Sequence, residues 1–283
     1  MTPSESTDFT PGRPVELMPG VRRLVAANGG MMTGPGTNTY IFGQQRLVIV
    51  DPGPAIDGQV EAIEAAVAGT QVEAIVVTHT HVDHSPAAGE LARRLGVPLL
   101  GRRPRHTLYQ DAGFEPTRSV EAGDSVDTDI GPLCAVLTPG HASNHVCWHL
   151  PHAGLVCTGD HILGNVSPVI VHPDGSLLEY LDSLQRVLDL EPKAFLPGHG
   201  PVVLNTRATI ERLVAHRNLR EQRVMNALQD AGCMSVDALL TRVYADVPPA
   251  LHGVARHTLL AHLVKLEIEE RVVVCGEDAW QAV

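Results

Sequence analysis

Apolar residues recur at two spacings along the first two hundred residues of the chain. Short β-branched runs predict buried strands, and apolar residues three or four positions apart predict helices packed against them. The strand-like runs lie at 21–27, 38–42, 47–51, 72–77, 97–100, 133–137, 145–150, 155–158 and 193–196, and the helical patterns lie at 56–67, 86–95 and 177–188. Two successions of strands followed by helices, without an evident repeated β-α-β alternation, indicate a mixed α/β sandwich.

The pattern changes after Asn205. A long helical pattern covers 206–230, Ser235 caps a second helix that ends near Tyr244, and a third helix covers 250–270. Two strand-like segments, 271–275 and 279–283, then form a predicted hairpin. Helices followed by a hairpin are similar to a small winged-helix unit. We therefore predict two domains, a mixed α/β domain over residues 1–205 and a winged-helix-like domain over residues 206–283.

Composition describes an ordinary globular chain of 283 residues, with 44% apolar and 19% charged residues. No run approaches the roughly 20 apolar residues that cross a bilayer. Residues 1–14 lack the basic start and apolar centre of a signal peptide, so we expect a cytoplasmic location and no membrane partner. The five cysteines form no CxxC pair and mostly lie in apolar runs. From this we expect no structural disulfide and no thiolate ligand.

The net charge of −11 is concentrated in the predicted α/β domain. Residues 1–205 contain 12 Lys and Arg against 22 Asp and Glu, whereas residues 206–283 contain 9 against 10. An acidic body disfavours non-specific nucleic-acid binding, which depends on cationic surface. One local cluster of arginines departs from this acidic character. We interpret it as a solvated surface rim rather than a binding site for anionic substrates. It consists of Arg93, Arg94, Arg102, Arg103 and Arg105.

The densest candidate chemistry follows the strand 72–77 directly. The segment Thr78-His79-Thr80-His81-Val82-Asp83-His84 places three imidazoles and a carboxylate within six residues, where the strand stops. Imidazole and carboxylate donors together suit divalent zinc, manganese or iron. His79 and His81 can address one ion, and Asp83 and His84, further along, can address a second. The sequence therefore predicts a site for two metal ions.

Three further strand ends each carry one metal-capable residue beside a glycine. They are Gly140-His141, Gly159-Asp160 and Gly198-His199. A glycine lets the backbone approach an ion closely, and a strand end gives its side chain a rigid position. With the first cluster, these residues supply seven donors.

The seven donors, with an aspartate at Asp51 after an early strand, resemble the motifs of the metallo-β-lactamase superfamily. The resemblance covers about residues 15–205 and implies a four-layer αββα sandwich with the metals at one edge. It further implies that His79, His81 and His141 hold one metal and that Asp83, His84 and His199 hold the other. Asp160 would then bridge both ions, and Asp51 would orient a ligand.

Two cations that share a water lower its pKa toward neutrality and polarise the oxygen of the bond that is attacked. The resemblance therefore implies hydrolysis by a bridging hydroxide, with Asp83 and Asp160 as the catalytic carboxylates. No GxSxG segment indicates a covalent nucleophile. Because true β-lactamases lack the bridging aspartate, a small ester, thioester or lactone is a better substrate prediction than an antibiotic.

The segments around these motifs resemble the β-lactamase-like protein 2 group over nearly the whole chain. Some members of that group are endoribonucleases, so cleavage of single-stranded RNA is one alternative to a small-molecule substrate. A second alternative is a persulfide dioxygenase-like oxidoreductase, in which His79, His141 and Asp160 would bind a single iron ion. We expect two zinc ions, with manganese or iron as alternatives, and a homodimer through the tail by analogy only.

Four side chains near the ligands are candidates for protonating a leaving group, although a supporting or surface role is preferred for each. They are His145, His161, His172 and Tyr180.

Overall fold

Two β-sheets face each other in the computed structural model, which describes residues 3–283. The first sheet has seven strands in sequential order. They are β1 (Val15–Met18), β2 (Val21–Val25), β3 (Asn38–Phe42), β4 (Arg46–Val50), β5 (Gln71–Val76), β6 (Leu99–Gly101) and β7 (Arg118–Ser119). The second sheet runs in the order β12 (Ala194–Pro197), β11 (Leu155–Gly159), β10 (Val146–Leu150), β9 (Gly131–Leu137), β8 (Ser125–Thr128).

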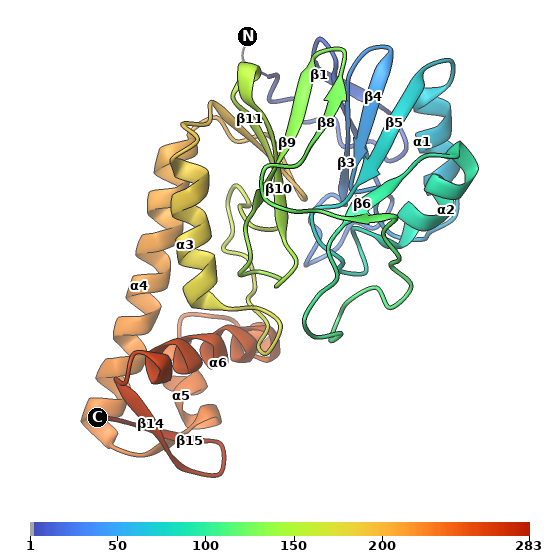
Figure 1. Cartoon of the computed structure of the whole chain (residues 1–283). Coiled ribbons are helices and arrows are strands. Elements are labelled where there is room, and N and C mark those ends of the chain that lie inside the picture. Colours follow the sequence, from blue (N-terminus) through green and yellow to red (C-terminus); the bar gives the residue numbers. More distant parts are fainter. Residues whose placement is uncertain (1–2) are drawn as a thin grey trace.

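Helices cover the outer face of each sheet, which gives the four-layer αββα sandwich that the resemblance implied (Figure 1). Helices α1 (Gln59–Val67) and α2 (Pro86–Leu95) pack on the first sheet, and α3 (Leu177–Leu188) and α4 (Thr206–Ala231) lie on the side of the second. Alternation along the strands supplies the layers: in β4, Val48 and Val50 point between the sheets, whereas Leu47 and Ile49 point toward α1 and α2.

The first sheet contains a β-α-β alternation that the sequence analysis did not find. Strands β4, β5 and β6 are parallel neighbours, and α1 and α2 form the two crossovers between them. The expectation that no such alternation occurs was therefore wrong. The individual strands and helices of this unit were predicted, but short apolar runs do not show which strands pair or in which direction. This parallel arrangement brings the ends of β4 and β5 to the same edge of the sheet.

The tail contains α5 (Val236–Val243), α6 (His252–Ile268) and a three-stranded sheet in the order β13 (Met234–Ser235), β15 (Ala279–Ala282), β14 (Val272–Gly276). Short 3-10 turns lie at Pro151–Ala153 and Pro249–Leu251. Ser235 caps α5 by accepting a hydrogen bond from the Ala238 backbone N–H, as predicted. Helix α4, of 26 residues, runs from the sandwich into the core of the tail over about 39 Å. The boundary at residue 205 stays a prediction, because α4 packs against both parts.

A disulfide joins Cys233 to Cys275, so the expectation of no structural disulfide was wrong. The two Cα atoms are 6.2 Å apart although 42 positions separate the residues. Sheet pairing in the tail brings them together, and spacing in the sequence does not reveal such a long-range pairing. Cys147 and Cys157 are buried in the sandwich as free thiols. No helix of the described residues is long and apolar enough to span a bilayer.

Replacing both Cys233 and Cys275 by serine is expected to lower the free energy of unfolding of the tail by about 3–4 kcal/mol, because the bond closes a long loop in the unfolded chain. Denaturant unfolding under non-oxidising and oxidising conditions measures the difference. Cys134→Ser, at a half-buried free cysteine, is the matched control and should change little. An unchanged midpoint in the double variant would show that the bond does not form in solution.

Candidate metal centre

Strands β4 and β5 deliver the first part of the site. Asp51 follows β4, and its carboxylate accepts hydrogen bonds from the Thr78 backbone N–H (2.6 Å) and hydroxyl (2.7 Å), at the end of β5. The same carboxylate lies 2.9 Å from Nδ1 of His84. The Trp148 indole on β10 donates to the Val77 carbonyl (3.3 Å) and thereby ties the second sheet to this turn. The histidine-rich segment is thus held from both sheets.

Strands β9, β11 and β12 deliver the other three predicted residues. His141 follows β9, and Asp160 and His199 follow β11 and β12, which are parallel neighbours. The Gly198 N–H donates to the Gly159 carbonyl (2.8 Å), so these two turns lie against each other. The structure therefore brings all seven predicted side chains together, from four strand ends of two sheets.

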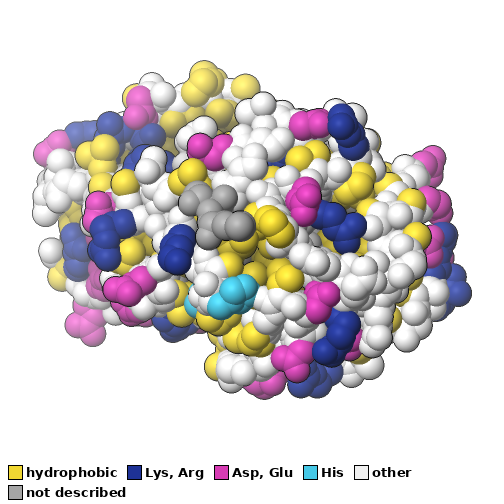
Figure 2. Space-filling model, turned by 90° about the horizontal axis from the view of Figure 1, so that it is seen from above, with side chains coloured by type: hydrophobic (Ala, Val, Ile, Leu, Met, Phe, Trp, Pro, Cys, Tyr) yellow, Lys and Arg dark blue, Asp and Glu magenta, His cyan; other side chains and the backbone are white. Residues whose placement is uncertain are grey.

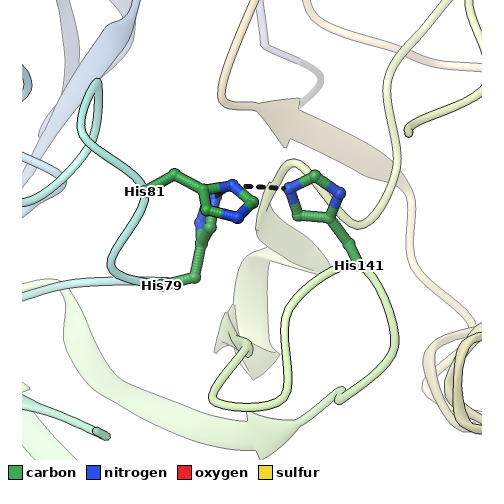
Figure 3. A group of neighbouring side chains, drawn as sticks. All are labelled: His79, His81 and His141. Carbon is green, nitrogen blue, oxygen red and sulfur yellow. Dashed lines mark hydrogen bonds between the residues drawn. The ribbon is translucent and has the colours of Figure 1, made fainter. Parts of the chain in front are cut away.

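Three overlapping groups of these side chains can each hold an ion, with ligand atoms within 4.8 Å of one another. The first contains His79, His81 and His141, drawn in Figure 3, where Nδ1 of His81 lies 2.9 Å from Nε2 of His79 and 3.0 Å from Nε2 of His141. The others are His79, His84 and Asp160, and Asp83, His84 and His199. The first and third groups contain the two ligand sets that the resemblance implied, while the assignment of each residue to an ion stays a prediction.

The imidazoles are oriented by partners on their outer nitrogens. Nδ1 of His141 donates to the Val169 carbonyl (2.6 Å), and Nδ1 of His199 donates to the Gly36 carbonyl (3.2 Å). Nδ1 of His79 lies 3.0 Å from the Thr78 hydroxyl. Together with Asp51 on His84, these partners leave Nε2 of four histidines facing the cluster. Metal-bound histidines in proteins are held in this way.

Carboxylates supply the negative charge that cations would require. Burial opposes ionisation of Asp160, but His199 and His84 hold the pKa of its carboxyl well below the usual range. Burial also opposes ionisation of Asp83, and His84 above all lowers its pKa to about 2. Burial lowers the pKa of His199 while Asp160 and Asp83 raise it, to about 9 overall. Both carboxylates are therefore ionised at neutral pH.

Two buried atoms at the centre have no hydrogen-bond partner within the described chain. They are Nε2 of His84 and Oδ1 of Asp160. A buried polar atom without a partner is costly. Divalent cations would satisfy both atoms, and the set of imidazole nitrogens and carboxylate oxygens suits such ions. The residues therefore fit the metals that the resemblance implied, while the identity of the metal stays a prediction.

Of the four candidates for protonating a leaving group, three lie behind the ligands. His145 stacks on His79 with ring centroids 5.0 Å apart, and His161 lies between His145 and Tyr180. All three are essentially without solvent exposure, and burial lowers the pKa of His161 to about 3. The fourth, His172, is exposed. These positions favour the supporting or surface role over proton donation.

Each arginine of the cluster at 93–105 pairs with a glutamate. Arg94 contacts Glu61, Glu64 and Glu90, and Arg105 contacts Glu179. Arg93 pairs with Glu90, Arg102 with Glu121 and Arg103 with Glu115. Figure 2 shows basic and acidic side chains interspersed on the face that it displays. These pairs favour the solvated-rim interpretation.

Sequence reasoning missed the supports that come from the main chain. The carbonyls of Val169 and Gly36 orient two ligands, and a carbonyl carries no signal in a sequence. It also missed Asp174, a buried carboxylate that accepts hydrogen bonds from Ser143 and Gln110 and joins two loops near the site. An aspartate directly after a proline in a loop offers no motif by which to find it.

Gly198→Ala is expected to weaken metal binding by about tenfold or more. An added Cβ would lie 2.6 Å from both Oδ1 of Asp160 and Cε1 of His84, so at least one ligand must move. Metal content and affinity, measured by competition with a chelator, test this. Gly89→Ala on α2 has open space around its Cβ and serves as the control, with unchanged metal binding. Full metal affinity in Gly198→Ala would contradict the close approach.

Comparison with known proteins gives the family. Residues 32–199 match the family described as Metallo-beta-lactamase superfamily, and residues 235–280 match the Beta-lactamase associated winged helix domain. The chain belongs to the metallo-beta-lactamase superfamily. Members of this superfamily are in general metal-dependent hydrolases that bind two metal ions, and the chain is an enzyme of this class. The tail is a winged-helix domain of the kind found with these enzymes.

Relatives of the superfamily match most of the chain. A Beta-lactamase-like protein 2 homolog from Caenorhabditis elegans is 30% identical over 262 residues, covering 89% of this chain and 86% of the relative. An Atrochrysone carboxyl ACP thioesterase from Aspergillus fumigatus is 30% identical over 217 residues, covering 76% of this chain and 66% of the relative. A beta-lactamase domain protein from Burkholderia ambifaria has a similar fold, with a TM-score of 0.85 at 23% identity, covering 100% of this chain and 97% of that one.

Proposed function

We propose that this metallo-beta-lactamase superfamily enzyme uses two divalent metal ions, zinc first among them, to hydrolyse a small ester, thioester or lactone. The observation that supports this most directly is the position of the Asp160 carboxylate. Its Oδ1 lies 3.4 Å from Nε2 of both His84 and His199, and its Oδ2 lies 3.9 Å from Nε2 of His141. One carboxylate therefore reaches toward both ligand groups, as a bridging ligand would.

Two cations held there would supply a hydroxide at neutral pH and polarise the carbonyl that it attacks. The protein contributes geometry and proton transfer. Asp83 is the more exposed of the two catalytic carboxylates, with 26% of its side chain accessible against 13% for Asp160, and its Oδ2 lies 3.2 Å from Nε2 of His199. A carboxylate at the open side of the cluster can accept the proton of the attacking water and pass it to the departing alcohol or thiol.

Two observations favour a small substrate. One relative carries the name of a thioesterase. In addition, each arginine of the cluster at 93–105 is paired with a glutamate, which leaves that rim without spare positive charge for an RNA backbone.

The test is turnover on a panel of alkyl and aryl esters, acyl thioesters and lactones, with labelled single-stranded RNA in parallel and metal content measured on the same sample. Hydrolysis of one small-substrate class with two metal ions per chain is the expected result. Cleavage of RNA alone would favour the ribonuclease alternative. One iron per chain with oxidation of a thiol substrate would favour the dioxygenase.

A further inference from the structure

A cavity lies away from the seven donors, between the sandwich and the tail. Its walls come from the loop 165–169, the middle of α4, the segment between α5 and α6, and the first half of α6. The cavity volume is about 350 Å³, within the usual range for small-molecule sites. None of the seven predicted metal ligands lines it, so the cavity is separate from the metal centre.

The charge of this cavity is opposite to that of the chain. Three arginines line it, namely Arg212, Arg217 and Arg220, and its lining includes no aspartate or glutamate. The whole chain carries a net charge of −11. A cluster of three guanidinium groups without acids is therefore a local departure in composition. Arginine is the residue that binds phosphate and carboxylate groups most effectively.

Arg217 lacks the counter-ion that its burial requires. It is 2% exposed, and no carboxylate of the described chain lies within 4.0 Å of it. Its Nη2 donates to the Pro168 carbonyl, and its guanidinium lies 5.2 Å from the centre of the Tyr180 ring. Its Nε has no partner among the described residues. A buried charge is costly unless it is paired, so an anion in the cavity would stabilise this arrangement.

Arg220 contributes further donors. Its Nη1 contacts the Val243 carbonyl (2.9 Å) and Asp246 (2.7 Å), and it stacks over Tyr244 at 4.6 Å. Its Nε and the hydroxyl of Tyr244, which is 5% exposed, have no partner within residues 3–283. His216 also lines the cavity. Burial and then the positive charges of Arg217 and Arg220 lower its pKa to about 4, so the imidazole is neutral at pH 7. Asp246 therefore pairs with one end of the Arg220 guanidinium, while Nε of Arg220 and the Tyr244 hydroxyl have no partner within residues 3–283.

The opposite part of the lining is apolar. It is formed by Val247, Leu251, Val254 and Ala255, from the start of α6 and the segment before it. A ligand that fills the cavity would place an anionic group against the arginines and carbon atoms against this wall. The enclosed position of Arg217 favours a small molecule over a nucleic-acid backbone, which needs an open cationic groove.

We propose that this cavity binds a small molecule in which a phosphate or carboxylate group is joined to an apolar body. The shared wall gives the site a connection to the metal centre, since Val169 lines the cavity and its carbonyl orients His141. The proposal does not depend on which bond the metal centre hydrolyses.

Calorimetric titration of the metal-loaded full chain tests the proposal with four probes: hexyl phosphate, hexanoate, inorganic phosphate and uncharged hexanol. Hexyl phosphate or hexanoate should bind, and the stronger of the two identifies the head group. Hexanol and inorganic phosphate should bind more weakly, because each lacks one half of the recognised structure. Absence of binding by both hexyl anions at millimolar concentration would overturn the proposal.

Two variants locate the binding, because an anion can also bind at the metals. Arg217→Met removes the unpaired charge, and Ala255→Glu places a carboxylate in the cavity; each should weaken binding by about tenfold or more. Ala215→Glu, at an exposed position of α4 outside the lining, adds the same charge and should bind as the wild type does. Unchanged affinity in the folded pocket variants would place the anion elsewhere and overturn the proposal. If neither variant folds, the wild type provides the test. Nuclear Overhauser contacts between the hexyl chain and the methyl groups of Leu251 and Val254 would support the proposal, and their absence would overturn it.

Discussion

Replacement of Asp160 by asparagine is expected to lower kcat/KM for the best substrate of the panel by roughly 10³-fold or more, with the fold intact. The amide keeps the size of the side chain but removes its negative charge and leaves one oxygen where two now reach toward both ligand groups. Metal ions held by the two ligand groups would then lose a carboxylate that reaches both groups, and with it negative charge that would help to hold them. Initial rates, together with metal content from elemental analysis, measure both effects.

The matched control for this variant is Asp182→Asn, which makes the same substitution at an exposed position of α3. Its activity should remain within about twofold of the wild type, because surface substitutions away from a site have small effects. Circular dichroism and thermal unfolding of both variants separate loss of function from loss of fold. A folded Asp160→Asn protein with two bound metals and nearly full activity would refute the bridging role.

Removal of metal by a chelator is expected to abolish activity and to lower thermal stability, and re-addition of zinc should restore both. Ions that bind only the folded state stabilise it by about 4 kcal/mol per site when their free concentration is a thousandfold above Kd. Activity that persists after the metal content has fallen below a tenth of an equivalent would contradict metal dependence.

The same experiment has a pH dependence with a defined sign. In the metal-free protein, burial lowers the pKa of His199 but Asp160 and Asp83 raise it to about 9, so this imidazole is protonated at pH 7. The pairing of His199 with these carboxylates stabilises the metal-free fold below pH 6.5, and this contribution is lost as the pH rises through about 9. A metal must displace the proton, so apparent metal affinity should strengthen between pH 7 and pH 9. Titrations in buffers of different ionisation enthalpy should detect proton release; a pH-independent affinity would contradict the assignment of His199 as a ligand.

Local sequence signals were sufficient for most elements of the fold. Helices 86–95 and 177–188 begin and end where the sequence predicts, because Pro86 fits a first helical turn, Gly96 adopts the left-handed conformation that ends a helix, and Ser176 caps the second helix with its side chain. Strand β1 was missed, since Val15–Met18 is short and lies at the edge of its sheet. The parallel unit at β4, β5 and β6 was missed because strand pairing is a property of the folded chain.

The residues of the candidate site could be predicted more completely than the fold around them. The seven metal-capable side chains, between residues 79 and 199, each follow the end of a predicted strand. Because the ends of packed strands meet at one edge of a sheet, the sequence predicts that these side chains lie close together. The remaining parts could not. The disulfide between Cys233 and Cys275 and the arginine-lined cavity both depend on how α4 places the tail, and pairings of this range leave no local trace in the sequence.

The main-chain carbonyls behind His141 and His199 define how this enzyme can diversify. Gly36 and Val169 belong to loops beside the site, and they act through backbone atoms that every amino acid possesses. The side chain at Val169 is therefore interchangeable in principle, whereas Gly36 must remain glycine, because a Cβ there would lie 2.2 Å from the Ala26 carbonyl oxygen. Adding or deleting a single residue in either loop would shift an acceptor away from an imidazole. Libraries built to alter substrate preference should accordingly vary loop composition at constant length.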